Sequence, residues 1–307
     1  MPPPSLFVDC DPGHDDAIAL AVAAARSRLL GVTTVAGNAP LEHTTRNALA
    51  VVQLLGIDVD VHSGAGGPLR GSAVEHATHV HGEHGLDGVT LPELRRSVVS
   101  DDAAGFLIEA THEHPGAWLV PMGPLTNIAL MLQRDPGVVD RIAGISIMGG
   151  GTFGNVTPMA EFNIHFDPEA ADVVLRCGAP IVMCGLDLTQ QLLVDDALVV
   201  RSRALPNQFG AFAADLFAGY LANIRALTRE DRDGALHDPC AVLAVTDPEW
   251  FEVAARRVVI ETSGEHTRGM TVVDQRSWAR GGNVQWAQTI DARAATEAVI
   301  DAIAAAP

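Results

Sequence analysis

Four aspartates lie within eight residues near the start of the chain, in the stretch DCDPGHDD. They are Asp9, Asp11, Asp15 and Asp16, and an apolar run flanks the stretch on each side. Ionised carboxylates repel one another when they are packed together, unless a cation lies between them. Oxygen ligands of this kind select a hard ion, Ca²⁺ or Mg²⁺. The stretch therefore predicts a divalent-cation site, and the alternative is that the acids cap a helix and face solvent.

Sparse polar side chains follow several other apolar runs. Any one of them alone is typical of a turn or a helix cap. Together they suit hydrogen bonding to a polyhydroxylated ligand, which the three glycines of SIMGGG would let the backbone approach closely. The set comprises Asn38, Thr126, Asn127, Asn155, Glu161 and Asn163.

The segment HDPCAV carries a further carboxylate more than two hundred residues after the first four. Pro239 suits the first position of a helix, so Asp238 could be its cap. Alternatively, Asp238 is another ligand for the cation, with His237 beside it as a proton donor. The sequence leaves both interpretations open.

A histidine-rich segment, HATHVHGEHG, contains His76, His79, His81 and His84. Histidine is a common zinc ligand, so a zinc site is one interpretation. However, a glycine-containing loop without cysteine is a poor structural zinc site. We favour a flexible loop over the active site, with one histidine facing the substrate.

These residues must be positioned by alternating strands and helices. The apolar pattern predicts strands over 5–11, 29–37, 59–65, 117–123, 141–150 and 179–189, and helices over 15–27, 41–56, 103–116, 125–136 and 167–178, with Gly56 ending the second helix. This rhythm predicts an α/β fold: an open, mostly parallel, Rossmann-like sheet flanked by helices, in one domain spanning 1–307. Residues 66–100 and 203–236 are the most irregular parts.

The first strand would present Asp9 and Asp11 on one face, because side chains alternate along a strand. Pro12 and Gly13 then turn the chain, and Asp15 and Asp16 fall in the first turn of the next helix. Ligands of open α/β sheets bind at this carboxyl edge.

Composition excludes some classes of function. The chain has 307 residues and a net charge of −18, which argues against nucleic-acid binding and against binding to an anionic membrane. Its four cysteines lack metal-finger spacing, so we expect reduced thiols and a cytoplasmic location. We also expect no signal peptide and no membrane span.

The motifs together resemble the nucleoside hydrolase family, the inosine-uridine and pyrimidine ribonucleoside hydrolases. The resemblance rests on DCDPGHDDA, TTVAGN, HGEHGLDG, MGPLTNIA, IMGGG, AEFN, DPEAA, GLDLT and HDPCAV, in this order along the chain. It implies the family's fold and Ca²⁺-dependent hydrolysis of the N-glycosidic bond of uridine, cytidine or inosine to ribose and free base, in nucleoside salvage or catabolism. It also implies a homodimer or homotetramer.

The resemblance also implies roles for single residues. Asp11, Asp16 and Asp238 resemble the calcium carboxylates, Thr126 would add its backbone carbonyl, and Asp9 would support them. Asp15 resembles the general base that activates a calcium-bound water. His237 resembles the residue that protonates or orients the leaving base. The substrate-binding residues would be Asn38, His81, Asn155, Glu161 and Asn163. Ca²⁺ is favoured over Mg²⁺ because this mixed oxygen shell suits a larger, more flexible ion.

One segment departs from the family's pattern. Relatives carry aromatic residues just before HDP that pack on the base, whereas this chain has Arg225, Arg229 and Arg232 there and its only tyrosine, Tyr220, further upstream. The base preference therefore stays open. Two other functions remain: a non-catalytic nucleoside- or ribose-binding protein, and a Mg²⁺-dependent phosphohydrolase that begins with DxD. The second is disfavoured because such enzymes need a lysine and this sequence has none.

Overall fold

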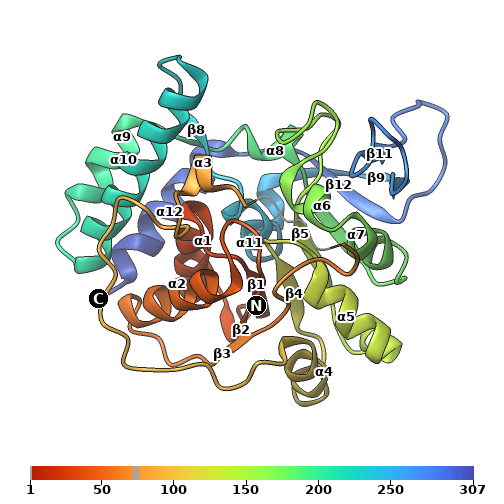
Figure 1. The fold of residues 1–307 in the computed structure, drawn as a ribbon, viewed down its shortest axis with the longest axis horizontal. Coiled ribbons are helices and arrows are strands. Elements are labelled where there is room, and N and C mark those ends of the chain that lie inside the picture. Colours follow the sequence, from red (N-terminus) through yellow and green to blue (C-terminus); the bar gives the residue numbers. More distant parts are fainter. Residues whose placement is uncertain (1, 72–75) are drawn as a thin grey trace.

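A computed structural model describes residues 2–71 and 76–307 and places an eight-stranded sheet at the centre of the protein (Figure 1). The strand order is β3-β2-β1-β4-β5-β6-β12-β9, and all neighbours pair in parallel except β12 and β9. The strands of this sheet are β1 Ser5–Cys10, β2 Arg28–Thr34, β3 Val61–Ser63, β4 Trp118–Pro121, β5 Gly144–Met148, β6 Ile181–Cys184, β9 Phe251–Arg256 and β12 Val284–Ile290. Two small pairs, β7 Leu193–Val194 with β8 Gly234–Ala235 and β10 Val258–Ile260 with β11 Thr271–Val273, lie outside it.

Helices connect the strands and cover the sheet. They are α1 His14–Arg26, α2 Leu41–Leu54, α3 Thr78–His81, α4 Ala103–Glu113, α5 Thr126–Arg134, α6 Phe162–Phe166, α7 Pro168–Leu175, α8 Leu186–Thr189, α9 Asp196–Arg203, α10 Gln208–Thr228, α11 Pro239–Thr246 and α12 Ala292–Ala305. Two short 3₁₀ segments cover Pro136–Asp140 and Pro248–Trp250. None of the helices described here is long and apolar enough to cross a membrane.

Each face of the sheet packs against its own set of helices. Along β1, Leu6, Val8 and Cys10 join a core with α1, α2, α10, α11 and α12, whereas Phe7 joins a second core with α4, α5 and α7. This alternation is what a strand buried on both faces produces. Figure 1 shows α9 and α10 on the left of the molecule and β9 and β11 on the right.

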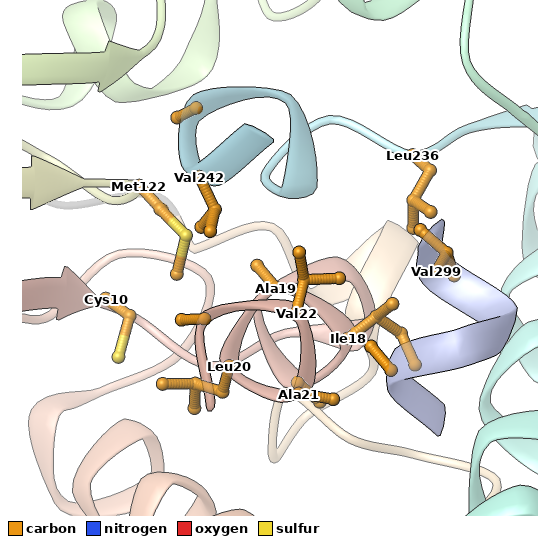
Figure 2. Packing of buried hydrophobic residues seen from close by; sticks show 14 of the residues in the cluster. Cys10, Ile18, Ala19, Leu20, Ala21, Val22, Met122, Leu236, Val242 and Val299 are labelled. Carbon is orange, nitrogen blue, oxygen red and sulfur yellow. The ribbon is translucent and has the colours of Figure 1, made fainter. Parts of the chain in front are cut away.

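Helix α1 is the best-buried helix of the first core. Figure 2 shows its side chains Ile18, Ala19 and Val22 among Val242 of α11 and Val299 of α12, with Cys10 of β1 on the sheet side. The helix carries small and branched apolar residues all round, because it is enclosed between the sheet and two other helices. Its first turn is therefore held firmly at the carboxyl edge of β1.

The predicted alternating α/β order is confirmed up to residue 189, with one difference: residues Leu186–Thr189 form the short helix α8 instead of extending a strand. The prediction that Gly56 ends the second helix is confirmed, since Gly56 follows the cap residue Leu55 of α2 and has a positive φ of 63°. The prediction that 203–236 is irregular is wrong, since α10 alone fills 21 residues of it. The C-terminal elements β9 to α12 were not predicted.

Candidate active site

The aspartates of DCDPGHDD are all buried at the carboxyl edge of β1. Asp9 lies in β1, Asp11 lies one residue beyond the strand, and Asp15 and Asp16 occupy the first turn of α1. Because β1 ends at Cys10, the strand alternation expected for Asp9 and Asp11 does not reach Asp11. Asp238, at the start of α11, joins Asp15 and Asp16, so that one carboxylate oxygen from each lies within 4.8 Å of the other two.

Hydrogen bonds from the backbone hold Asp16 and Asp11 in place. The amides of Gly13 and Asp11 donate to the Asp16 carboxylate at 2.8 and 3.1 Å. The amide of Asn38 donates to Oδ2 of Asp11 at 2.6 Å, and a side-chain carbon at Gly37 would collide with the same carboxylate. Asp16 therefore does brace the helix start, as the capping alternative supposes, while it also faces the other carboxylates.

Asp9 is buried and lies outside the lining of the cavity that opens above this cluster. The Thr33 hydroxyl donates to its Oδ1 at 2.5 Å and Asn127 Nδ2 donates to the same oxygen at 2.8 Å. Its Oδ2 is buried without a hydrogen-bond partner, and burial raises the pKa of Asp9 to about 7. The supporting role of Asp9 stays a prediction.

Burial shifts every carboxyl of the cluster in the same direction. It raises the pKa of Asp16 to about 7 and that of Asp15 to about 6, the latter held back by amide hydrogen bonds that include those of His237 and Asp238. The pKa values of Asp11 and Asp238 are raised well above the usual range of a carboxyl. Burial is the main cause for both, and the charge of Asp16 adds to it at Asp11 and that of Asp15 at Asp238. None of the ion pairs between described residues includes a member of this cluster. An anionic, oxygen-only cluster without a basic partner fits a hard divalent cation.

Two observations bear on the other predicted metal ligands. Asp238 precedes α11, but its side chain makes no capping hydrogen bond, so capping alone does not account for it. Thr126 begins α5, and its hydroxyl donates to Asp167 Oδ2 at 2.8 Å, a hydrogen bond that does not involve the carbonyl predicted as the ligand. Asp11 and Thr126 lie outside the three-carboxylate group.

A cavity of about 570 Å³ opens above the cluster. Eight of the predicted site residues line it: Asp15, Asn38, His81, Asn155, Glu161, Asn163, His237 and Asp238. Asp9, Asp11, Asp16 and Thr126 are buried outside the lining. The structure thus brings residues from both ends of the chain to one cavity, with the deeper acids behind its wall.

The turn into α6 presents three polar side chains to the cavity. Glu161 accepts hydrogen bonds from the amides of Gly150, Asn163 and Ile164 at 2.8 to 3.1 Å, and burial raises its pKa to about 7. Asn163 Nδ2 donates to the Met122 carbonyl at 2.7 Å, and Asn155 Oδ1 accepts from the Phe162 amide. These residues are helix-capping and turn-forming groups, and they also line the cavity.

His237 is half-buried in the cavity wall, and its Nδ1 lies 2.7 Å from the Thr189 hydroxyl. Burial lowers the pKa of His237 to about 4, so the ring is neutral at pH 7. Thr189 was missed by the sequence analysis as a site residue, although it ends the quoted motif GLDLT. Nothing in the sequence indicated that it contacts a histidine 48 residues away.

The histidines of the predicted loop have separate partners. His81 lies against His14, His76 Nδ1 lies 2.7 Å from the Gly37 carbonyl, and the His84 ring is 4.6 Å from that of His43. The side chain of His79 lies outside the described residues. Among the described residues no group of three ligands forms here, so the zinc alternative gains no support.

Helix α10 and the segment after it supply part of the cavity lining. Tyr220, Ile224 and Leu227 of α10 line the cavity, and the Tyr220 hydroxyl donates to the Ala235 carbonyl at 2.8 Å. Arg232 also lines the cavity, whereas Arg225 pairs with Asp196 and Asp231. Arg229 follows α10 in a left-handed conformation with a φ of 58°. Tyr220 and Arg232 therefore reach the cavity, whereas Arg225 and Arg229 are not part of its lining.

Comparison with known proteins settles the family. The model of the inosine-uridine preferring nucleoside hydrolases matches residues 6–297. The chain belongs to this family. It is 44% identical over 275 residues to the pyrimidine-specific ribonucleoside hydrolase RihA of Shewanella woodyi, covering 88% of each chain. It is 41% identical over 274 residues to RihA of Salmonella typhimurium, again covering 88% of each chain.

Solved structures of nucleoside hydrolases agree with this assignment. The purine-preferring ribonucleoside hydrolase from Gardnerella vaginalis superposes with a TM-score of 0.92, at 32% identity and with 98% of each chain covered. The predicted fold class is therefore confirmed, and the chain is an enzyme of the nucleoside hydrolase family rather than a phosphohydrolase.

Proposed function

We propose that the protein is a calcium-dependent ribonucleoside hydrolase in which Asp15 activates the attacking water. The observation that carries this proposal is the group of buried carboxylates Asp15, Asp16 and Asp238, two of which, Asp15 and Asp238, line a cavity that also carries the polar side chains Asn38, Asn155, Glu161 and Asn163. Asp11, Asp16, Asp238 and the carbonyl of Thr126 would form the ligand set, which leaves Asp15 for the water. A bound Ca²⁺ would orient the ribose hydroxyls and lower the pKa of water.

Asp15 would accept a proton from water. The support is that its carboxyl lines the cavity and that its pKa of about 6 leaves it ionised at pH 7. The transition state of N-glycosidic cleavage should carry positive charge on the ribose, as in glycoside hydrolysis. The carboxylates around the ribose would stabilise that charge. Asn38, Asn155, Glu161 and Asn163 would bind the ribose hydroxyls.

His237 would act on the leaving base. Since burial keeps its ring neutral at pH 7, its contribution would be a hydrogen bond that orients the base. The leaving base would take its proton from solvent water as the glycosidic bond breaks, and Asp15 would return to solvent the proton that it took from the attacking water. His81, which ends α3 and lines the cavity, would lie beside the base.

We further propose uridine and cytidine as the preferred substrates. The support is that the relatives at 44% identity are pyrimidine-specific, whereas the purine-preferring structure is 32% identical. Tyr220 is the only aromatic residue among those of α10 that line the cavity. Helix α10 therefore offers the larger ring system of a purine no second aromatic side chain on which to stack.

The test is a kinetic panel of uridine, cytidine, inosine and adenosine, measured as release of reducing sugar with and without a calcium chelator. We expect turnover of the pyrimidine nucleosides that is lost on chelation and recovered with Ca²⁺. Calorimetric binding of uridine without product would instead identify a non-catalytic binding protein. Turnover that is unaffected by the chelator would contradict the calcium dependence.

A further inference from the structure

His14 is a buried residue of the DPGHDD turn to which no role has so far been assigned, and it contacts the loop above the cavity twice. Its Nδ1 lies 3.0 Å from Nδ1 of His81, and its Nε2 lies 3.1 Å from the carbonyl oxygen of Asp87. The His14 and His81 rings are stacked, with centroids 5.3 Å apart and planes 28° apart. Tyr220 of α10 lies 6.4 Å from His81 on a nearly parallel plane.

The loop itself has little regular structure of its own to fix it. Between α3 and residue 98 it contains no helix or strand, and Gly82, Gly85 and Gly88 all have positive φ. Its position depends on side chains from elsewhere. Asn47 Nδ2 donates to both the Pro12 and the His84 carbonyls, at 3.0 and 2.7 Å, and so ties the loop to the same turn.

We propose that His14 is a positioning residue for the base: it fixes residues 81–87 and the ring of His81 in the wall of the substrate cavity. This inference rests on the proposed function, because it assigns the base end of that same site. His14 itself lies outside the cavity lining, whereas His81 is in it, so His14 acts through His81.

The partners of His14 fix the direction of two hydrogen bonds. A carbonyl oxygen can only accept, so Nε2 of His14 donates to Asp87. The backbone amide of His14 can only donate, and it donates to Nδ1 of His81 at 3.2 Å. Nδ1 of His14 lies 3.0 Å from the same His81 nitrogen, so the side chain and the backbone of His14 together hold one atom of His81.

Three substitutions separate the two contacts. In His14→Asn the side-chain amide takes the place of Nδ1 and keeps a polar partner for His81, while the contact with Asp87 is lost. In His14→Gln the amide nitrogen takes the place of Nε2 and keeps the donor for Asp87, while the contact with His81 is lost. His14→Phe keeps a ring and loses both. Gln53→Ala is the matched control, since Gln53 holds the same loop further along, at Glu93 and Arg95, away from the cavity.

The first measurement is KM for uridine beside the inhibition constant of ribose, the product that lacks the base. We expect His14→Phe and His14→Gln to raise KM about tenfold, the size of one lost hydrogen bond, and His14→Asn and Gln53→Ala to stay within about twofold. The inhibition constant of ribose and the calcium midpoint should stay unchanged in all four. An equal rise in KM for uridine and in the inhibition constant of ribose would overturn the proposal. So would a smaller rise in KM in His14→Gln than in His14→Asn.

The second measurement is hydrogen exchange of the amides of residues 80–88, which needs no activity. We expect faster exchange in His14→Phe than in the parent protein and no change in Gln53→Ala. Unchanged exchange in His14→Phe would overturn the proposal. A parent protein that exchanges slowly here yet hydrolyses no nucleoside would refute the proposed function while leaving the loop contact in place, so the two failures are distinguishable.

Discussion

The Thr189 hydroxyl lies 2.7 Å from Nδ1 of His237, with Thr189 buried and His237 half-buried at the cavity wall. Thr189 ends α8, and His237 precedes α11, so this hydrogen bond joins the ends of two neighbouring segments on the carboxyl side of β6. A hydroxyl can accept from Nδ1–H or donate to Nδ1, and in either case it fixes the rotation of the imidazole ring.

Replacing Thr189 should therefore impair the step that involves the base. We expect Thr189→Val, which keeps the shape and removes the hydroxyl, to lower kcat about tenfold with little change in KM, because one hydrogen bond to a neutral group is lost. Thr189→Ser restores the hydroxyl and should recover most of kcat. Steady-state kinetics on uridine provide the measurement. Equal losses in the two variants would place the effect in packing instead.

Asp15 and Asp238 line the same cavity and belong to the same group of three carboxylates, but different roles are proposed for them. Asp15→Asn should lower kcat about a thousandfold by removing the general base, while the calcium midpoint changes little. Asp238→Asn should weaken calcium binding and activity together, with activity partly recovered at high Ca²⁺. Two measurements distinguish these roles: calcium titrations, in which the melting temperature reports binding, and steady-state kinetics at each calcium concentration. A thousandfold weaker calcium affinity in Asp15→Asn would make Asp15 a ligand.

The sequence predicted those parts of the site that are local. The strand, the turn at Pro12 and Gly13 and the first turn of α1 occupy consecutive residues, so alternation, turn chemistry and capping were sufficient to place them. Asp238 was different. Its spacing from Asp16 carries no periodic signal, and only the resemblance to a family connected the two.

The parts that sequence reasoning missed depend on distant contacts. Helix α10 lacks the polar face that identifies an amphipathic helix, because its exposed stripe consists largely of alanines, Ala211, Ala218, Ala222 and Ala226. Its start was readable, since the Asn207 side chain caps the helix by accepting from the Gly210 amide. The His14–His81 contact joins residues 67 apart, and only the folded chain brings them together.

Removal of the 2′-hydroxyl of the substrate should expose the contribution of the ribose site. The carboxylate cluster and the side chains of Asn38 and Asn163 would lose a hydroxyl partner. A site that binds a hydroxyl discriminates strongly against a substrate that lacks it, because buried polar groups of the protein are then left unpaired. We expect kcat/KM for 2′-deoxyuridine to be at least about a hundredfold below that for uridine. The comparison needs both substrates at the same calcium concentration. Comparable rates would argue against binding of the ribose diol at the cluster.

Calcium should control how stability depends on pH. Burial raises the pKa values of Asp9, Asp16 and Glu161 to about 7 and that of Asp15 to about 6 in the folded protein, against ordinary values near 4. Between about pH 4 and pH 7 the folded state therefore binds more protons than the unfolded state. The free energy of unfolding of the chelated protein should consequently fall as pH rises through this range.

Bound Ca²⁺ should reverse this loss, because it offsets the repulsion between ionised carboxylates and binds only the folded chain. We expect the melting temperature of the chelated protein to be lower at pH 8 than at pH 5.5, and added Ca²⁺ to raise it more at pH 8. Differential scanning calorimetry at both pH values, with Asp238→Asn as a variant of weakened site, measures this. A melting temperature at pH 8 that is insensitive to both chelator and Ca²⁺ would contradict a cation at the aspartate cluster.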